Sequence, residues 1–342
     1  MPIIDINKRV TTKLEHIDNK FHPNITLNAR LAILHSLQEI IKIKYHYKIS
    51  KTNDISQLIY KIFTYNKLTG SKLLKFKQMV DYQAKCYINC YDMTYIIFNL
   101  INVKYRDLLL KYFQQNKTNK KYIHIMTDVD DTLFANPKFP AGSDYSHTPK
   151  ELYPNVVHLF KSLNETDYVT LLTARPFFLE KKMRSDDNKI KQAFGEINIL
   201  TGSRSYKELF NVLKSYKDYL KGSPFTNPTY IAMGEKKYSD FKKYINIYPE
   251  YKIIFFGDTG QGDLYAATKM TKKSKNVVCL IHHIVDKNGK YTYENDNDYQ
   301  RIYPMKGMKF YKLKLFKDNK NLYMFDNYTD LKNSVNYFKS LM

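Results

Sequence analysis

Two short apolar runs that both end in acidic turns constrain this chain most. Residues 122–126 are mostly apolar and lead into Asp128-Val-Asp-Asp-Thr132. Residues 253–256 lead in the same way into Gly257-Asp258, with Asp263 five residues further on. Short apolar runs bounded by turns are typical of buried strands, and parallel strands place their carboxyl ends at one edge of a sheet. We therefore expect both turns to contribute carboxylates to one site.

An alternation of strand, turn and helix begins near residue 122. The expected strands are 122–127, 168–173, 197–200, 229–232, 252–256 and 276–282. The expected helices are 155–163, 177–193, 205–220, 236–247 and 262–271. This pattern favours βαβ units. We predict an α/β fold with a parallel, Rossmann-like sheet.

The first 118 residues have a different pattern. Apolar residues recur at helical spacing in 29–47 and 55–63, and 73–113 can hold one long or two medium helices. Gly70 is an expected helix break. A polar, Lys-rich run from 114 to 121 is a suitable linker. We predict a helical, basic N-terminal domain over 1–118 and a second domain over 119–342.

The second domain is expected to carry a C-terminal extension from about residue 283. Residues 287–290 read Lys-Asn-Gly-Lys, which is a hairpin-like turn. Tyr- and Lys-rich strands and a last helix near 328–341 are expected to follow.

The net charge of +22, with a pI near 9.5, attracts phosphate-rich partners. These partners include nucleic acid, an anionic membrane surface and phosphorylated metabolites. In the N-terminal domain Lys interleaves with Tyr, which suits an anionic membrane surface or nucleic acid. A solvated face, or a genome that favours lysine codons, explains the charge as well. Abundant Lys, Asn, Ile and Tyr are typical of an AT-rich genome, such as that of a giant virus or a parasitic protist.

The three cysteines include no CxxC pair, so we expect buried thiols and no disulfide framework. The N-terminus has no signal-peptide pattern. No uncharged apolar run reaches the roughly 18 residues of a membrane span. We expect no transmembrane segment and an intracellular, cytoplasmic protein that could contact a membrane peripherally.

The first acidic turn can support phosphoryl transfer. Asp128 follows the strand directly, so its carboxylate can attack a phosphate to give an aspartyl-phosphate. Asp130 can protonate the leaving group and then deprotonate water. Thr132 and nearby amides can bind phosphate oxygens. Clustered carboxylates repel one another unless a cation lies among them, and hard oxygen ligands suit Mg²⁺. The alternative is a solvated Asp-rich turn.

Other candidates follow the remaining strands. Thr173 can bond a phosphate oxygen and Arg175 can add charge, although this stretch could simply start a helix at Pro176. A Lys before the helix 236–247 could hold the negative charges together. Asp263 either completes the acidic cluster or caps a helix.

In chain order, these residues resemble the four motifs of the haloacid dehalogenase (HAD) superfamily over residues 122–282. The matching stretches are Asp128-x-Asp-x-Thr132, Thr173, a Lys, and Gly257-Asp258 with Asp263. The stretches 127–133, 153–157, 168–176 and 248–260 more closely resemble the catalytic domain of the fungal actin-patch phosphatidate phosphatases and their bacterial relatives. That family shows a Lys twelve residues before the Pro of a Phe-Pro or Tyr-Pro step, and counting back from Pro249 selects Lys237 over Lys236.

The resemblance implies a HAD-like fold and the roles of individual residues. Asp128 would be the nucleophile, and Asp130 the acid/base that binds Mg²⁺ through its backbone carbonyl. The implied metal set is Asp128, Asp130, Asp258 and Asp263. The implied phosphate-binding set is Thr132, Thr173, Arg175 and Lys237.

Three departures concern the substrate. Thr259 replaces the usual Ser, 173–176 reads Thr-Ala-Arg-Pro instead of Ser-Asn-Ser-Pro, and 1–118 does not match the family's N-terminal region. We expect a Mg²⁺-dependent phosphatase, with phosphatidate-like lipids as the candidate substrate. One alternative is the same chemistry on a nucleic-acid end, a phosphoprotein or a metabolite. Another is a non-catalytic basic protein that binds membrane or RNA.

Overall fold

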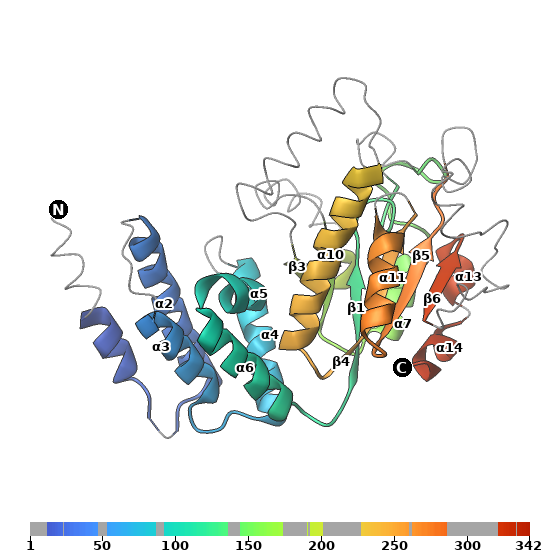
Figure 1. Cartoon of the computed structure of the whole chain (residues 1–342). Coiled ribbons are helices and arrows are strands. Elements are labelled where there is room, and N and C mark those ends of the chain that lie inside the picture. The colour runs from blue at the N-terminus through green and yellow to red at the C-terminus, as the bar shows by residue number, and fades with distance from the viewer. Residues whose placement is uncertain are drawn as a thin grey trace. The chain divides into compact units, whose positions relative to one another are not determined.

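The chain forms two compact units in a computed structural model (Figure 1). The structure describes residues 12–22, 24–46, 53–86, 92–135, 144–173, 190, 192–200, 227–259, 262–285, 321–332 and 334–342. The first unit comprises Met1–Lys121 together with Lys243–Glu250, and the second comprises Tyr122–Lys242 together with Tyr251–Met342.

A parallel sheet organises the second unit, which confirms the predicted α/β class. Among the described residues six strands pair in the order β3-β2-β1-β4-β5-β6, and every pair is parallel. The strands are β1 Tyr122–Thr127, β2 Tyr168–Leu172, β3 Glu196–Leu200, β4 Tyr251–Asp258, β5 Val277–His282 and β6 Leu322–Phe325.

The chain adds its first strands on one side of β1 and its later strands on the other, so the winding of the sheet reverses between β1 and β4. From β1 the chain proceeds to β2 and β3 on one side, and then returns to β4, β5 and β6 on the other. β1 and β4 pair along the whole of β1, from Tyr122 beside Tyr251 to Thr127 beside Phe256. Doubly wound sheets bind ligands outside the carboxyl ends of the strands at such a reversal. Both acidic turns follow these two strands.

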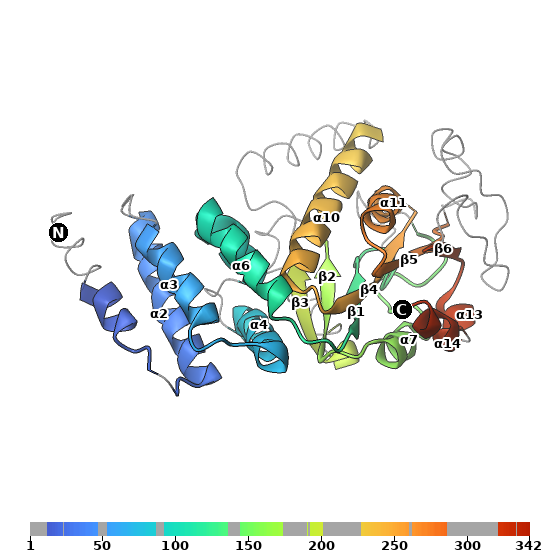
Figure 2. The ribbon, with the colours of Figure 1, turned by 60° about the horizontal axis from the view of Figure 1, so that its bottom comes forward.

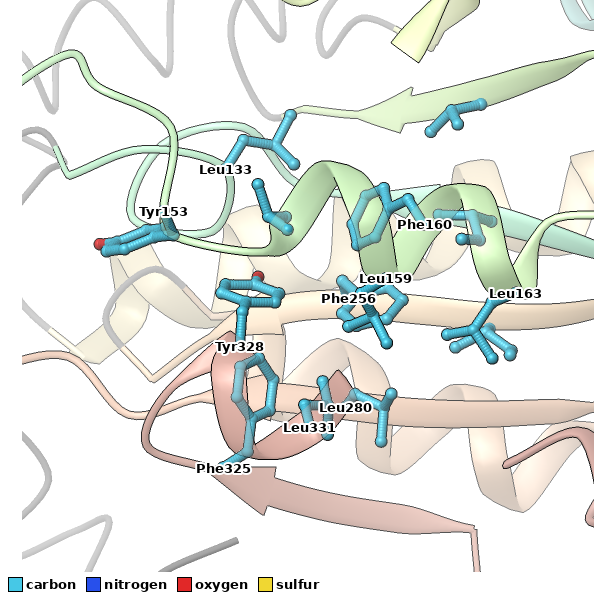
Figure 3. Close-up of a cluster of buried hydrophobic side chains, with 14 of the residues drawn as sticks. Leu133, Tyr153, Leu159, Phe160, Leu163, Phe256, Leu280, Phe325, Tyr328 and Leu331 are labelled. Atoms are coloured by element: carbon cyan, nitrogen blue, oxygen red, sulfur yellow. The ribbon is translucent and has the colours of Figure 1, made fainter. Parts of the chain in front are cut away.

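Helices cover both faces of the sheet, which explains why its strands read as continuous apolar runs. Figure 2 shows α11 (Asp263–Lys273) on one face and α7 (Val156–Leu163) with α13 (Tyr328–Lys332) and α14 (Val335–Ser340) on the other. On the α7 face, Phe160 packs against Phe256 with ring centroids 4.5 Å apart. Leu133, from the first acidic turn, lies in the same buried cluster (Figure 3).

One predicted strand, 229–232, is wrong. These residues belong to α10, which runs from Asn227 to Ile247 and extends the helix expected at 236–247. A short apolar run cannot be assigned to strand or helix by periodicity alone. Pro228 lies in the first turn of the helix, where its missing N–H leaves no intrahelical bond unmade.

Helices make up the secondary structure of the described part of the first unit. These helices are α2 Leu27–His46, α3 Asn53–Thr64, α4 Gly70–Cys86, α5 Met93–Tyr95, the π-helix Ile96–Leu100 and α6 Val103–Gln115. We expected one long or two medium helices in the stretch 73–113, but it contains parts of α4 and α6 with two short helices between them. Gly70 begins α4 with a positive φ of 56°, so the helical pattern does break there.

The segment 243–250 completes the core of the first unit. The buried Lys77 ammonium donates to the Ile247 carbonyl at 2.7 Å and to Glu250 at 2.6 Å. Its nitrogen also lies 4.8 Å from the ring centroid of Tyr248. The Tyr248 hydroxyl donates to Asp81 at 2.6 Å. The last turn of α10 and the turn after it therefore belong structurally to the N-terminal helices.

The C-terminal helix expected at 328–341 is two short helices, α13 and α14. Ser334 between them has a non-helical backbone conformation, with φ −109° and ψ 15°. The expected helix 205–220, nearly all of 177–193, and the turn at 287–290 lie outside the described residues. Among the residues described, none of the helices has the length and apolarity needed to cross a membrane.

Candidate active site

Asp128 is fixed at the point where β1 leaves the sheet. Its N–H donates to the Phe256 carbonyl of β4 at 2.9 Å, which carries the strand pairing one residue past Thr127. The Thr127 hydroxyl donates to the Asp128 carbonyl at 2.8 Å. Asp128 is only 2 % exposed. The strand end therefore places its carboxylate at the position that the sequence predicts for a nucleophile.

The second acidic turn folds a carboxylate back onto the end of β4. Asp263 is the first residue of α11, and its Oδ2 accepts the Asp258 N–H at 3.3 Å. A Cβ at Gly257 would lie 2.6 Å from the Asp263 Cβ, so only glycine allows this approach. Asp263 bonds to this strand end and to Lys237, which favours the acidic cluster over the helix-capping alternative.

Lys237 joins the two turns electrostatically. Its Nζ lies 2.9 Å from Oδ2 of Asp128 and also forms a very short ion pair with Oδ1 of Asp263. A Cβ at Gly234 would lie 2.6 Å from the Gly262 carbonyl oxygen, so this glycine permits close approach of α10 to the start of α11. The neighbouring Lys236 pairs instead with Asp240, at 2.6 Å.

Negative charge exceeds positive charge among the described groups of the site. Burial raises the pKa of Asp128 to about 8; Lys237 lowers it, while Asp263 and Asp130 raise it further. Burial also raises the pKa of Asp258 and of Asp263. Burial lowers the pKa of Lys237, but Asp128, Asp263 and Asp258 outweigh that effect and hold it above its ordinary value. An additional cation would relieve the repulsion that remains.

The donor set fits a hard divalent cation. One carboxylate oxygen from each of Asp128, Asp258 and Asp263 lies within 4.8 Å of the others. Oδ2 of Asp128 is buried and pairs with the Lys237 ammonium, 2.9 Å away. Buried carboxylate oxygens with spare acceptor capacity are suitable ligands for Mg²⁺. These residues could hold the metal that the sequence predicts.

The rest of the first turn is buried beside this cluster. The Thr132 hydroxyl donates to Oδ2 of Asp258 at 3.4 Å, which connects the two acidic turns directly. Asp130 is buried and forms an isolated bridge with Phe134. The structure therefore brings together five predicted residues of the first and second turns and Lys237: Asp128, Asp130, Thr132, Asp258, Asp263 and the lysine itself.

Two further predicted residues have different outcomes. Thr173 follows β2 at the same sheet edge and is buried. The register places Leu171 beside Thr127, so Thr173 lies two residues past this pair and one residue past the end of β2, which adjoins β1. Arg175 lies outside the described residues.

Sequence reasoning missed several buried polar residues around the first turn. Asp144 accepts hydrogen bonds from the hydroxyls of Tyr153 and Ser146 and, at 2.8 Å, from the Val285 N–H. No spacing in the sequence connects these partners. His282 also lies here, and its position at the end of an expected strand was the one available signal.

No protein-family model matches this chain, and no curated protein matches it.

Proposed function

We propose that the second unit is a Mg²⁺-dependent phosphatase with a HAD-like fold that forms an aspartyl-phosphate on Asp128. One observation carries the proposal. At the reversal point of a parallel sheet, Asp128 presents a buried carboxylate oxygen that pairs with the Lys237 ammonium at 2.9 Å and lies beside two further carboxylates. A carboxylate at a strand end can act as a nucleophile, and an anionic substrate requires the nearby positive charge.

The proposed reaction has two steps. In the first, an Asp128 oxygen attacks phosphorus, the bond to the ester oxygen breaks, and Asp130 gives a proton to the departing alkoxide. In the second, Asp130 takes a proton from water, the water oxygen attacks phosphorus, and phosphate leaves as the Asp128 carboxylate is restored. Asp130 gives one proton in the first step and recovers one in the second, so it returns to its starting protonation state.

The other residues have supporting roles in this proposal. Lys237 offsets the charge of Asp128 and of the phosphoryl oxygens, and Thr173 donates its hydroxyl to those oxygens. The Thr132 hydroxyl donates to Asp258, so Thr132 braces the loop. Asp258 and Asp263, with Asp128 and the Asp130 backbone, would hold Mg²⁺. When bound, the metal supplies positive charge that screens the carboxylates from the incoming phosphate.

A phosphatidate-like lipid is the substrate that we propose. The net charge of +22 supports an anionic partner, because each Lys or Arg near an anionic membrane contributes about 1 kcal/mol. The same charge would attract a nucleic-acid end. The two sources share a phosphomonoester and differ in what surrounds it, so experiment can separate them.

A substrate panel tests the proposal. The full chain would be assayed with Mg²⁺ on phosphatidate vesicles, nucleoside monophosphates, 3′-phosphorylated oligonucleotides, a phosphopeptide and a small aryl phosphate. Asp128→Asn is the control variant. We expect phosphate release from at least one substrate and none from the variant. Preference for vesicles supports the lipid, whereas preference for oligonucleotides supports a nucleic-acid end.

Two outcomes would contradict the proposal. Equal phosphate release by Asp128→Asn and the unaltered chain would remove Asp128 as the nucleophile. Absence of turnover on every substrate, combined with salt-sensitive binding to vesicles or RNA, would favour the non-catalytic alternative.

A further inference from the structure

A tyrosine from the C-terminal segment holds the first acidic turn, which we define as residues 128–134. The hydroxyl of Tyr328, the first residue of α13, donates to the Thr132 carbonyl at 2.6 Å. The side chain of Thr132 in turn donates to Asp258. Tyr328 therefore bonds directly to Thr132, and the side chain of Thr132 bonds to Asp258, a proposed metal ligand.

A histidine holds the adjacent carbonyl of the same turn. Nδ1 of His282, at the end of β5, lies 3.0 Å from the Asp131 carbonyl oxygen. Both ring nitrogens face backbone carbonyls, which only accept, so a neutral imidazole can donate to one of them, and the shorter contact favours the tautomer with its hydrogen on Nδ1. Nε2 of His282 lies 3.2 Å from the Asp326 carbonyl, and the Asp326 carboxylate lies 2.8 Å from Nδ1 of His283. The rings of Phe325 and Tyr328 pack against the imidazole with centroids 5.3 and 5.7 Å away, so the C-terminal segment also orients it.

The turn has a backbone conformation that requires outside support. Asp131 has a φ of 55°, in the left-handed region that L-residues with a Cβ rarely occupy. Such conformations are costly and persist where surrounding contacts determine them. His282 contacts the carbonyl of Asp131 itself, and Tyr328 bonds the carbonyl of the next residue, Thr132.

The ring of Tyr328 is held independently of its hydroxyl. It is buried among aromatic side chains, with its centroid 5.8 Å from that of Tyr153, 4.8 Å from Phe325 and 6.2 Å from Phe256 (Figure 3). A phenylalanine at this position would keep these ring contacts and lose only the donor to Thr132.

We propose that Tyr328 and His282 are positioning residues, through which the C-terminal segment 321–332 holds the first acidic turn in its reactive conformation. This inference rests on the proposed function for its effect on catalysis. Its structural part does not depend on that function: the turn should open more readily, and the carboxylates should bind a divalent cation less tightly, when either donor is lost.

The first experiment compares Tyr328→Phe with Tyr323→Phe. Tyr323 is a matched control because it is also a buried tyrosine, but its hydroxyl lies 3.2 Å from that of Tyr337, away from the turn. Amide hydrogen exchange would follow the N–H groups of Asp131 and Leu133, which donate within the turn. We expect about tenfold faster exchange in Tyr328→Phe, because a buried carbonyl loses its donor, and no change in Tyr323→Phe.

Divalent cation binding provides a second readout that requires no turnover. Mn²⁺ binding, measured by electron paramagnetic resonance, should weaken about threefold or more in Tyr328→Phe because Thr132 no longer steadies Asp258. If the aryl phosphate is a substrate, kcat should fall at saturating Mg²⁺ while its KM changes little.

A pair of His282 variants separates hydrogen bonding from packing. His282→Phe keeps a ring and loses the donor, whereas His282→Asn loses the ring and can place an amide N–H near the position of Nδ1. The proposal expects slower exchange in the turn and tighter Mn²⁺ binding in His282→Asn than in His282→Phe. The reverse order would show that packing alone matters and would overturn the role of His282.

Failure of this inference is distinguishable from failure of the proposed function. Unchanged turn exchange and Mn²⁺ binding in a folded Tyr328→Phe would overturn the role of Tyr328, whatever the activity. If Tyr328→Phe does not fold, the His282 pair decides whether the turn depends on these donors. Faster exchange with no phosphatase activity in the unaltered chain would retain the positioning role and reject the phosphatase.

Discussion

The Lys237 ammonium lies 2.9 Å from the Asp128 carboxylate, while the adjacent Lys236 pairs with Asp240. The two lysines are consecutive on α10, so the helical rotation between them decides which one enters the site. Lys237 is 1 % exposed, and it is the lysine that the family resemblance selects.

Replacing these two lysines separately should give very different results. Lys237→Met would leave Asp128 and Asp263 buried without their cation, and we expect activity to be abolished and the metal-free protein to lose about 3–5 kcal/mol of stability. Lys236→Met removes a partly exposed i,i+4 pair worth about 0.3–0.5 kcal/mol. Phosphate release and urea unfolding in EDTA would measure both. Similar losses in the two variants would contradict the assignment of Lys237.

Asp128→Asn should abolish phosphatase activity without unfolding the protein. An amide cannot form the phosphoryl-enzyme, so we expect kcat to fall by at least about a thousandfold. Removing one buried carboxylate also relieves repulsion from Asp263, so the melting temperature in EDTA should stay the same or rise. Circular dichroism and a melting curve provide the control for folding. Substantial residual turnover would rule out the proposed nucleophile.

Phosphatase activity should require Mg²⁺ and should be inhibited by Ca²⁺. Ca²⁺ prefers more ligands and longer bonds, so it would engage both oxygens of Asp128 and hinder the attack. Mg²⁺ should also raise the melting temperature, because a ligand that binds only the folded state stabilises it. Asp258→Asn should reduce this increase. Full activity in EDTA is the result that would reject a metal-dependent reaction.

The metal-free protein should lose stability as the pH rises from about 4 to about 8. Asp128 has an ordinary pKa of 3.8 and a folded-state pKa of about 8. Between these values the folded state keeps a proton that the unfolded state has released, so rising pH favours unfolding. The raised pKa values of Asp258 and Asp263 act in the same direction. Urea unfolding in EDTA at several pH values would show this slope, and Asp128→Asn should flatten it.

The buried ion pair of the first unit should be essential for its stability. Lys77→Met would leave the Glu250 carboxylate buried without its partner, and we expect a loss of about 3–5 kcal/mol. The double variant Lys77→Met/Glu250→Gln should recover part of that loss. Lys61→Met, which removes an exposed pair with Asp18, is the control and should cost at most about 1 kcal/mol. Equal losses from Lys77→Met and Lys61→Met would contradict this role.

This arrangement limits what a truncated chain can test. Tyr244, Ile247 and Tyr248 are fully buried in the first unit. Deleting residues 1–118 would expose all three, so loss of activity in such a deletion would not locate catalysis in the N-terminal helices. Charge-neutralising substitutions on exposed lysines of the full chain are the sharper test of membrane recruitment, because the fold is kept.

Most of the sheet and both acidic turns could be predicted from the sequence because their signals are local. Short apolar runs place β1 and β4, and the geometry of parallel sheets then brings Asp128 and Asp258 to one edge. Glycine at 257 is a local signal too, since a side chain there would collide with Asp263. The run at 229–232 failed because a short apolar segment lacks enough residues to show a period.

Other features were decided only by the tertiary structure. Lys237 is one of 55 basic residues, and its contacts with Asp128 and Asp263 depend on the close approach that Gly234 allows between α10 and Gly262. The same holds for Tyr328, whose hydroxyl reaches Thr132 because β6 extends the sheet beside β5. The sequence by itself determines which segments are buried and where the carboxylates gather, through periodicity and strand ends. Which distant side chains meet those carboxylates depends on long-range packing, which has no local periodic signal.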